Sequence, residues 1–254
     1  MKKLLYTLLA VSIIFSACKK EDEEPNNTNN FGNSSIYTYV PDNNFEIALI
    51  NLGFDNSLND TVLTAKIDTL TYLDVNYLNI ADLTGIEAFT ALTHLECVSN
   101  QLTSLDVSNN TNLTELSCQH NQLTSLDVSN NTALTYLNCS ANQLTSLDVS
   151  NNTALTYLQC GANKLTSLDV SNNTALVELY CHSNKLIYLD VRNGNNTNMY
   201  STYAALPDGA LYAGCYTFMN PNLYCIDVDD ASWSTTNWFA IDSQSFFSVD
   251  CSDK

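Results

Sequence analysis

Apolar residues recur along the chain with a fixed period of 21 residues from Leu92 onward. One segment returns five times, as LTHLECVSNQ at 92, LTELSCQHNQ at 113, LTYLNCSANQ at 134, LTYLQCGANK at 155 and LVELYCHSNK at 176. A second segment, LTSLDVSNNTA, starts at 102, 123, 144 and 165 and is altered only at Asn112. A fixed period near twenty residues indicates a solenoid, in which each repeat stacks on the next.

Within each repeat the apolar positions alternate as they do in a β-strand. Leu137 and Cys139 share one strand face, whereas Tyr136 and Asn138 share the other. Parallel strands from successive repeats would then stack at about 4.8 Å. We expect six positions of this repeat to point into the core: Leu134, Leu137, Cys139, Leu144, Leu147 and Val149.

Asparagine recurs where the chain leaves each strand. One column contains Asn121, Asn142, Asn163 and Asn184, and the second segment repeats the pattern at Asn110, Asn131, Asn152 and Asn173. A side-chain amide both donates and accepts, so it can satisfy backbone groups of the neighbouring repeat. We therefore predict two buried asparagine ladders.

The pattern LxxLxCxxNxL resembles the leucine-rich repeat, and the nested LxxLxVxxN is similar to the 21-residue nested bacterial class. Internalins are more distant relatives. The resemblance is strong over about residues 70–191. It implies a mainly β, parallel-strand leucine-rich repeat solenoid of 21-residue period.

Both ends of a solenoid must be closed. Residues 37–91 are predicted to contain a capping helix with a capping box at Asn43 and Glu46, a stop at Gly53, and irregular first repeats. Regular repeats are assigned to 92–192 and a C-terminal cap to 193–254. The C-terminal segment resembles the terminal module of Bacteroidetes leucine-rich repeat lipoproteins. Five aromatic residues would plug the open core there: Trp233, Trp238, Phe239, Phe246 and Phe247.

Residues 1–17 have the features of a signal peptide, with basic Lys2 and Lys3 before a short apolar run. The segment FSAC ending at Cys18 resembles a bacterial lipobox, which implies lipid attachment at Cys18; the alternative is an ordinary secretory signal cut after Ala17. Residues 18–36 are polar and predict a tether. Their acidic run, 21–24, is similar to surface-export signals of Bacteroidetes lipoproteins. The alternative is that the acidic run only keeps the tether soluble. We expect an exported outer-membrane lipoprotein exposed on the cell surface.

The nine cysteines divide into groups. Those at 97, 118, 139, 160 and 181 form an inward column of thiols, which cannot surround one Zn²⁺ tetrahedrally; disulfides between repeats are the other alternative. Cys225 and Cys251 would form a disulfide across the C-terminal cap, with Cys215 free or the alternative partner.

The formal net charge of −18, with 27 acidic and 9 basic residues, makes nucleic acid a poor partner. A column of outward carboxylates invites a Ca²⁺ site, but each repeat offers one carboxylate only, so a hydrated column is favoured. It consists of Asp106, Asp127, Asp148, Asp169 and Asp190. No metal, cofactor or catalytic constellation is predicted, and we expect a protein that is not an enzyme.

Variation between repeats collects on the outward face of the LTxLxC strand, because packing does not constrain it there. We expect this face to be the concave sheet and to mediate adhesion-type binding of a protein, with capture of a glycan as the alternative. We also expect a monomer that is attached to the membrane only through Cys18. Cross-strand tyrosine pairing that merely stabilises the sheet, or a passive accessory lipoprotein, are the alternatives. The candidate residues are His94, Glu96, Glu115, Tyr136, Asn138, Tyr157, Gln159, Glu178, Tyr180 and His182.

Overall fold

The computed structural model describes residues 36–205 and 211–252. The predicted signal peptide, the lipid-attachment residue Cys18 and all but the last residue of the tether lie outside the described residues. Within those ranges no helix has the length and apolar character needed to cross a membrane.

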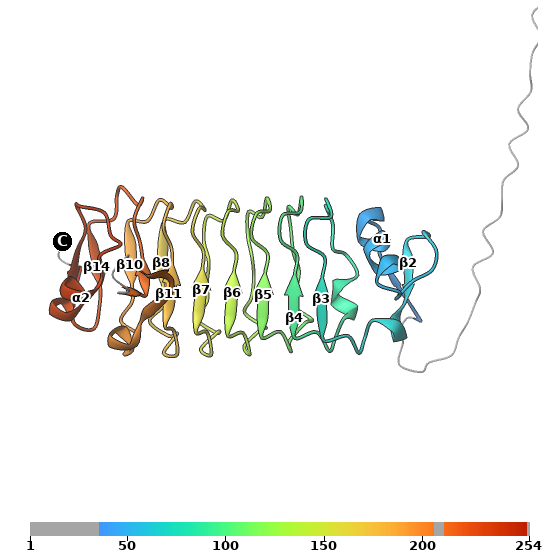
Figure 1. The fold of residues 1–254 in the computed structure, drawn as a ribbon, viewed down its shortest axis with the longest axis horizontal. Helices are drawn as coiled ribbons and strands as arrows, with labels where there is room; N and C mark the ends of the chain where they lie inside the picture. Colours follow the sequence, from blue (N-terminus) through green and yellow to red (C-terminus); the bar gives the residue numbers. More distant parts are fainter. Residues whose placement is uncertain (1–35, 206–210, 253–254) are drawn as a thin grey trace, which may run out of the picture. The chain divides into compact units, whose positions relative to one another are not determined.

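The repeats form one parallel sheet of seven short strands, in register from the first strand to the last (Figure 1). Because each strand comes from one repeat, the sheet runs along the length of the solenoid. This confirms the predicted parallel-strand leucine-rich repeat solenoid. The strands are β3 (Tyr72–Asp74), β4 (His94–Glu96), β5 (Glu115–Ser117), β6 (Tyr136–Asn138), β7 (Tyr157–Gln159), β9 (Glu178–Tyr180) and β13 (Cys215–Tyr216).

The nested half of the repeats forms a second sheet of four parallel strands in the C-terminal part of the solenoid. Its order is β15-β14-β10-β8. The strands are β8 (Ser167–Asp169), β10 (Tyr188–Asp190), β14 (Cys225–Asp227) and β15 (Phe246–Ser248).

The core lies between these two halves and contains the predicted inward residues. Leu134, Leu137, Cys139 and Leu144 are fully buried, and so are the five thiols of the cysteine column. Burial raises the pKa of Cys97 and Cys139 to about 12, so these thiols stay protonated at neutral pH.

Both asparagine ladders are present. Asn142 Nδ2 donates to the carbonyls of Cys118 and Cys139, and its Oδ1 accepts from Leu123 N–H. The nested ladder uses only the donor end: Asn152 Nδ2 donates to Val128 and Asn131, while its buried Oδ1 has no hydrogen-bond partner within the protein. The two ladders therefore hold the repeats together with unequal numbers of bonds.

The ladder that contains Asn142, called the main ladder below, has a left-handed backbone at the residue before each asparagine. The sequence did not indicate this conformation, because none of these residues is glycine. The φ angles lie between 52° and 60° at Ser99, His120, Ala141, Ala162, Ser183 and Met219.

The N-terminal cap consists of the antiparallel pair β1 (Tyr37–Tyr39) and β2 (Thr61–Leu63) and the helix α1 (Asn43–Asn51). The predicted capping box is wrong: Asp42 is the N-cap and accepts from the N–H groups of Asn44 and Phe45. Glu46 instead accepts from Asn59 and Thr61 N–H in the following loop. The short 3-10 helix η1 (Thr64–Lys66) precedes β3, and a second one, η2 (Ile86–Ala88), lies between β3 and β4.

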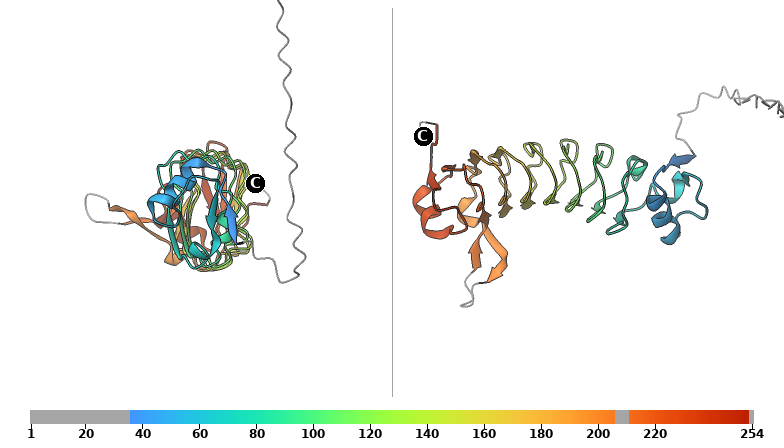
Figure 2. Two further views of the ribbon diagram at one scale, coloured as in Figure 1. Left: turned by 90° about the vertical axis from the view of Figure 1, so that its right-hand side faces the viewer. Right: turned by 90° about the horizontal axis from the view of Figure 1, so that it is seen from above.

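The solenoid extends beyond residue 192, where the sequence placed its end. An insertion containing η3 (Asn196–Asn198) and the antiparallel hairpin of β11 (Tyr200–Ala205) and β12 (Leu211–Ala213) separates β10 from β13. Figure 2 shows this hairpin standing out from the stacked repeats. The repeat then resumes: Cys215 pairs with Leu179, and Asn220 bonds to the carbonyl of Cys181 as the next ladder residue.

The C-terminal cap is completed by the helix α2 (Ala231–Asn237), β15 and a disulfide between Cys225 and Cys251. Cys215, whose pairing the sequence left open, is a free, buried thiol. Trp238 and Phe247 fill the core end, and Trp233 packs against it. The prediction that Phe239 and Phe246 would also plug the core is wrong, because their side chains are exposed.

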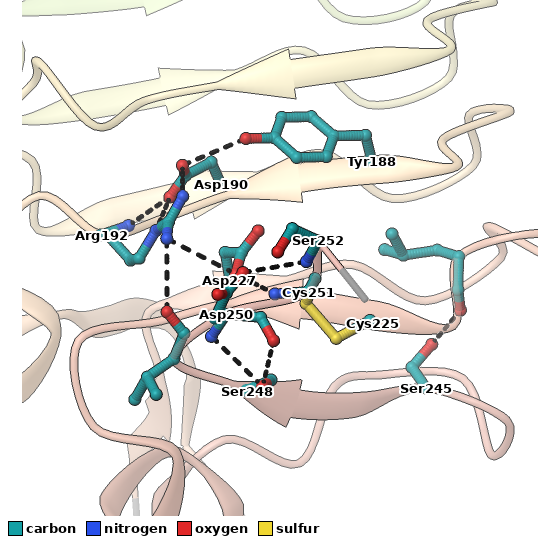
Figure 3. Close-up of a disulfide and its surroundings, with 12 residues drawn as sticks. Tyr188, Asp190, Arg192, Cys225, Asp227, Ser245, Ser248, Asp250, Cys251 and Ser252 are labelled. Atoms are coloured by element: carbon teal, nitrogen blue, oxygen red, sulfur yellow. Dashed lines mark hydrogen bonds and ion pairs between the residues drawn. A yellow bond between two sulfur atoms is a disulfide. The ribbon is translucent and has the colours of Figure 1, made fainter. Parts of the chain in front are cut away.

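An ion-pair network joins the last regular repeat to this cap (Figure 3). Arg192 Nε donates to Asp190 Oδ1 at 2.9 Å, and Nη1 donates to the carbonyl of Val249 at 3.2 Å. Asp227 lies 3.8 Å from the same guanidinium and accepts from Cys251 N–H. The network thus binds the C-terminal segment beside the disulfide.

Candidate functional site

The outward side chains of the seven-stranded sheet form two rows across the strands. Cross-strand partners place Tyr72, His94, Glu115, Tyr136, Tyr157 and Glu178 in the first row. The second row contains Asp74, Glu96, Ser117, Asn138, Gln159, Tyr180 and Tyr216. Nine of the ten residues proposed from the sequence therefore share these rows, and His182 lies just beyond the end of β9.

The C-terminal half of this face is packed. The rings of Tyr136 and Tyr157 are stacked with centroids 4.5 Å apart, and Tyr180 stacks on Tyr216 at 4.8 Å. Tyr157 and Tyr180 are only 8% and 7% exposed, and Glu178 accepts a 2.8 Å hydrogen bond from Tyr180. For these residues the structure favours the stabilising role over an open binding surface.

The amides between these rings are also engaged. Asn138 is buried, accepts from the N–H and hydroxyl of Ser140, and donates to Gln159. Gln159 Oε1 also accepts from the hydroxyl of Tyr157 at 2.6 Å. These contacts fix the amides within the sheet.

His182 lies just after β9, at the edge of the packed half. Its ring stacks on Phe218, with centroids 5.0 Å apart and an interplanar angle of 8°. On the other side it lies over Gly161, where an added Cβ would come within 2.8 Å of the ring. Burial lowers the pKa of His182, which favours the neutral imidazole.

The N-terminal half of the face is open to solvent. The side chains of His94 and Glu115 are 39% and 52% exposed and lie 3.3 Å apart, between His94 Nε2 and Glu115 Oε1. Tyr72 is 51% exposed, and its hydroxyl donates to Glu96. Exposed groups that hold each other in fixed positions are suited to contact a partner.

Two residues of this open half, Tyr72 and Asp74, were not among the sequence candidates. They occupy the outward positions of the first repeat, LTYLDV, which lies 22 residues before its equivalent in the next repeat. The extra residue breaks the 21-residue period. The LxxLxV spacing at residues 70–75 is the sequence pattern that could have identified Tyr72 and Asp74.

The nested half presents a different, acidic face. Asp106, Asp127 and Asp148 are exposed, and hydrogen bonds from the serine two residues later lower the pKa of each. Asp106 and Asp127 of this column, together with Asp82 and Glu87, line a hollow of about 640 Å³. In the described ranges, no three His, Cys, Asp or Glu side chains gather where they could hold a metal ion.

The fold and the two faces define a leucine-rich repeat solenoid with nested halves. The family described as "Leucine Rich repeats (2 copies)" matches residues 111–152. The chain is 51% identical over 79 residues to Internalin J of Listeria monocytogenes, a match that covers 30% of this chain and 8% of that relative.

Solved structures of internalins have the same fold. The functional domain of InlJ from Listeria monocytogenes, which includes a cysteine ladder, matches with a TM-score of 0.60 and 38% identity over 76% of this chain and 48% of that one. An internalin, InlF, from the same species matches with a TM-score of 0.53 and 21% identity, covering 82% of this chain and 68% of that one. The chain thus has the leucine-rich repeat fold and is similar to internalins over part of its length; it spans about half of the InlJ domain and 8% of Internalin J.

Proposed function

We propose that the chain is a binding module that holds a protein partner on the open half of the seven-stranded sheet. The observation that carries this proposal is the contrast within one face: His94 and Glu115 are exposed, whereas Tyr157 and Tyr180 are packed. The open residues also differ from repeat to repeat, while the nested LTSLDVS segment stays nearly constant. Likeness to internalins supports protein binding, and binding rather than catalysis is the role that we assign.

We further propose that the module is exported and displayed on the outer membrane through lipid at Cys18, without contacting nucleic acid. The basic start, the apolar run and the cysteine after small residues support this proposal. A polar tether between Cys18 and residue 36 would keep the solenoid accessible to a partner.

Glycan capture is the second candidate function. The exposed ring of Tyr72 offers a stacking surface, and Asn76 beside it carries an amide. A passive accessory role remains the outcome if the face has no ligand.

The test compares the wild-type protein with a face variant, Tyr72→Ser/Glu115→Ser, on arrays of extracellular proteins and of glycans. The matched control is Thr124→Ser/Asp127→Ser, which makes the same loss of one carboxylate on the nested face. Protein signals lost only in the face variant support the proposal. Glycan signals lost in the same way favour the second candidate, and signals unchanged in the face variant contradict both.

A further inference from the structure

The open half of the seven-stranded sheet has an unbalanced negative charge. Asp74 and Glu96 are cross-strand partners, and Glu115 lies on the next strand. Like charges directly opposite each other on a sheet are destabilising. No lysine or arginine in the described part of the chain pairs with any of these three carboxylates.

The sequence explains the missing counter-charge. Between Lys66 and Lys164 it contains neither Lys nor Arg, while Asp and Glu recur in that segment. Arg192, which does pair with carboxylates, belongs to the C-terminal end. The negative potential of the open half is therefore left for solvent or for a partner to neutralise.

The carboxylates are held in fixed positions. Glu96 accepts from Tyr72 through one oxygen, at 3.3 Å, and from Asn76 Nδ2 through the other, at 2.7 Å. Asp74 accepts from the N–H of Asn76 at 3.0 Å. Partial burial and the charges of Glu96 and Asp74 raise the pKa of Tyr72, in agreement with a negative field at its ring.

We infer that the partner presents a basic segment, rich in arginine or lysine, which binds over Tyr72, Asp74 and Glu96. This inference rests on the proposed function and names the chemistry of the partner. The exposed ring of Tyr72 offers a face for a guanidinium or ammonium group, and the two carboxylates beside it accept its hydrogen bonds. Arginine fits best, because its planar fork both stacks on a ring and donates to a carboxylate.

The probe is a short synthetic peptide of alternating arginine and glycine, and the same peptide with citrulline in place of arginine is its neutral control. Binding is measured by calorimetry at low and at physiological salt, with and without EDTA. We expect the arginine peptide to bind, to weaken as salt is added and to be unaffected by EDTA, and the citrulline peptide to bind at least about tenfold more weakly.

Two variants of equal net charge locate the site. Asp74→Asn/Glu96→Gln should weaken the arginine peptide about tenfold, whereas Asp127→Asn/Asp148→Asn on the nested face should change it by less than about twofold. Thermal melts check that both variants fold. Equal losses in the two variants would show general attraction to an acidic protein and overturn the inference, as would equal binding of the citrulline peptide. A neutral protein captured on the open half would leave the proposed function intact while overturning the basic partner.

Discussion

The phenol rings of Tyr136 and Tyr157 lie nearly parallel, with an interplanar angle of 8° and centroids 4.5 Å apart. They are cross-strand partners on β6 and β7. Tyr136 remains partly exposed, whereas Tyr157 is 8% exposed because it also lies beside Tyr180, with centroids 5.5 Å apart. This pair marks the boundary between the open and the packed halves of the face.

Replacing these two tyrosines should therefore have unequal effects. Tyr157→Ala removes a ring from a packed position and should cost about 3 kcal/mol of unfolding free energy, against about 1 kcal/mol for Tyr136→Ala. Urea unfolding followed by circular dichroism measures both. Equal losses would contradict the boundary that we place between the two rings.

The two asparagine ladders should also differ in strength. Asn142→Leu leaves the N–H of Leu123 without a partner. It also removes one of the two side-chain amides that donate to each of the carbonyls of Cys118 and Cys139, so we expect a loss of about 2–3 kcal/mol. Asn152→Leu removes one donor from each of two carbonyls, which keep their bonds from the N–H groups of Asn131 and Leu134. It also removes a buried oxygen that has no partner within the protein, so its loss should be about 1–2 kcal/mol. Melting of Asn142→Leu at or above the wild-type temperature would refute the main ladder.

Much of this fold could be predicted because each repeat is specified by its own residues. The spacing of Leu134, Leu137 and Cys139 determines which side chains are buried, and it is the same in every copy. The asparagine ladders followed for the same reason, since one residue type at one position serves each repeat. The solenoid could therefore be predicted from sequence patterns that are local to one repeat and recur in every copy.

What the sequence did not predict depends on contacts between distant segments. The repeat at Cys215 was hidden because an insertion precedes it and because Thr217 stands one residue beyond the paired Tyr216, where earlier repeats have cysteine. Asp42 was missed as the N-cap. Its position depends in part on the N–H groups of Ala81 and Asp82, which donate to it and lie far along the chain. The packed and open halves of the candidate site could not be separated either, because outward residues of every repeat follow the same pattern.

The left-handed residue in each repeat predicts a stabilising substitution. Ala162 has a φ of 54°, a conformation that costs a residue with a Cβ about 1 kcal/mol and costs glycine little. Ala162→Gly should therefore raise the unfolding free energy by about 0.5 kcal/mol after its greater flexibility in the unfolded chain is counted. Ala133, which is outside the left-handed region, is the control, and Ala133→Gly should destabilise the protein. Chemical denaturation compares the two, and a loss at both positions would contradict the prediction.

The Arg192 network predicts a pH-dependent defect in the C-terminal cap. Asp190 is 4% exposed, and although burial opposes its charge, hydrogen bonds from Arg192 lower its pKa. Because the folded pKa lies below the unfolded value of about 3.9, this stabilisation is present above that pH and is lost as the pH falls through the folded pKa. Arg192→Met leaves Asp190 and Asp227 buried without their cation, which should cost about 2 kcal/mol at pH 7, a value reduced for the 38% exposure of the Arg192 side chain.

The same substitution should do less harm in acid. Without the guanidinium, burial favours the neutral form of Asp190, so protonation relieves the defect and the difference from wild type should shrink between pH 7 and about pH 4. Lys185→Met, which removes an exposed positive charge outside this network, is the control and should change stability little at either pH. Urea midpoints at the two pH values measure the effect. A deficit in Arg192→Met that is equal at pH 7 and pH 4 would mean that Arg192 stabilises the cap by packing and by its bond to Val249 rather than by charge.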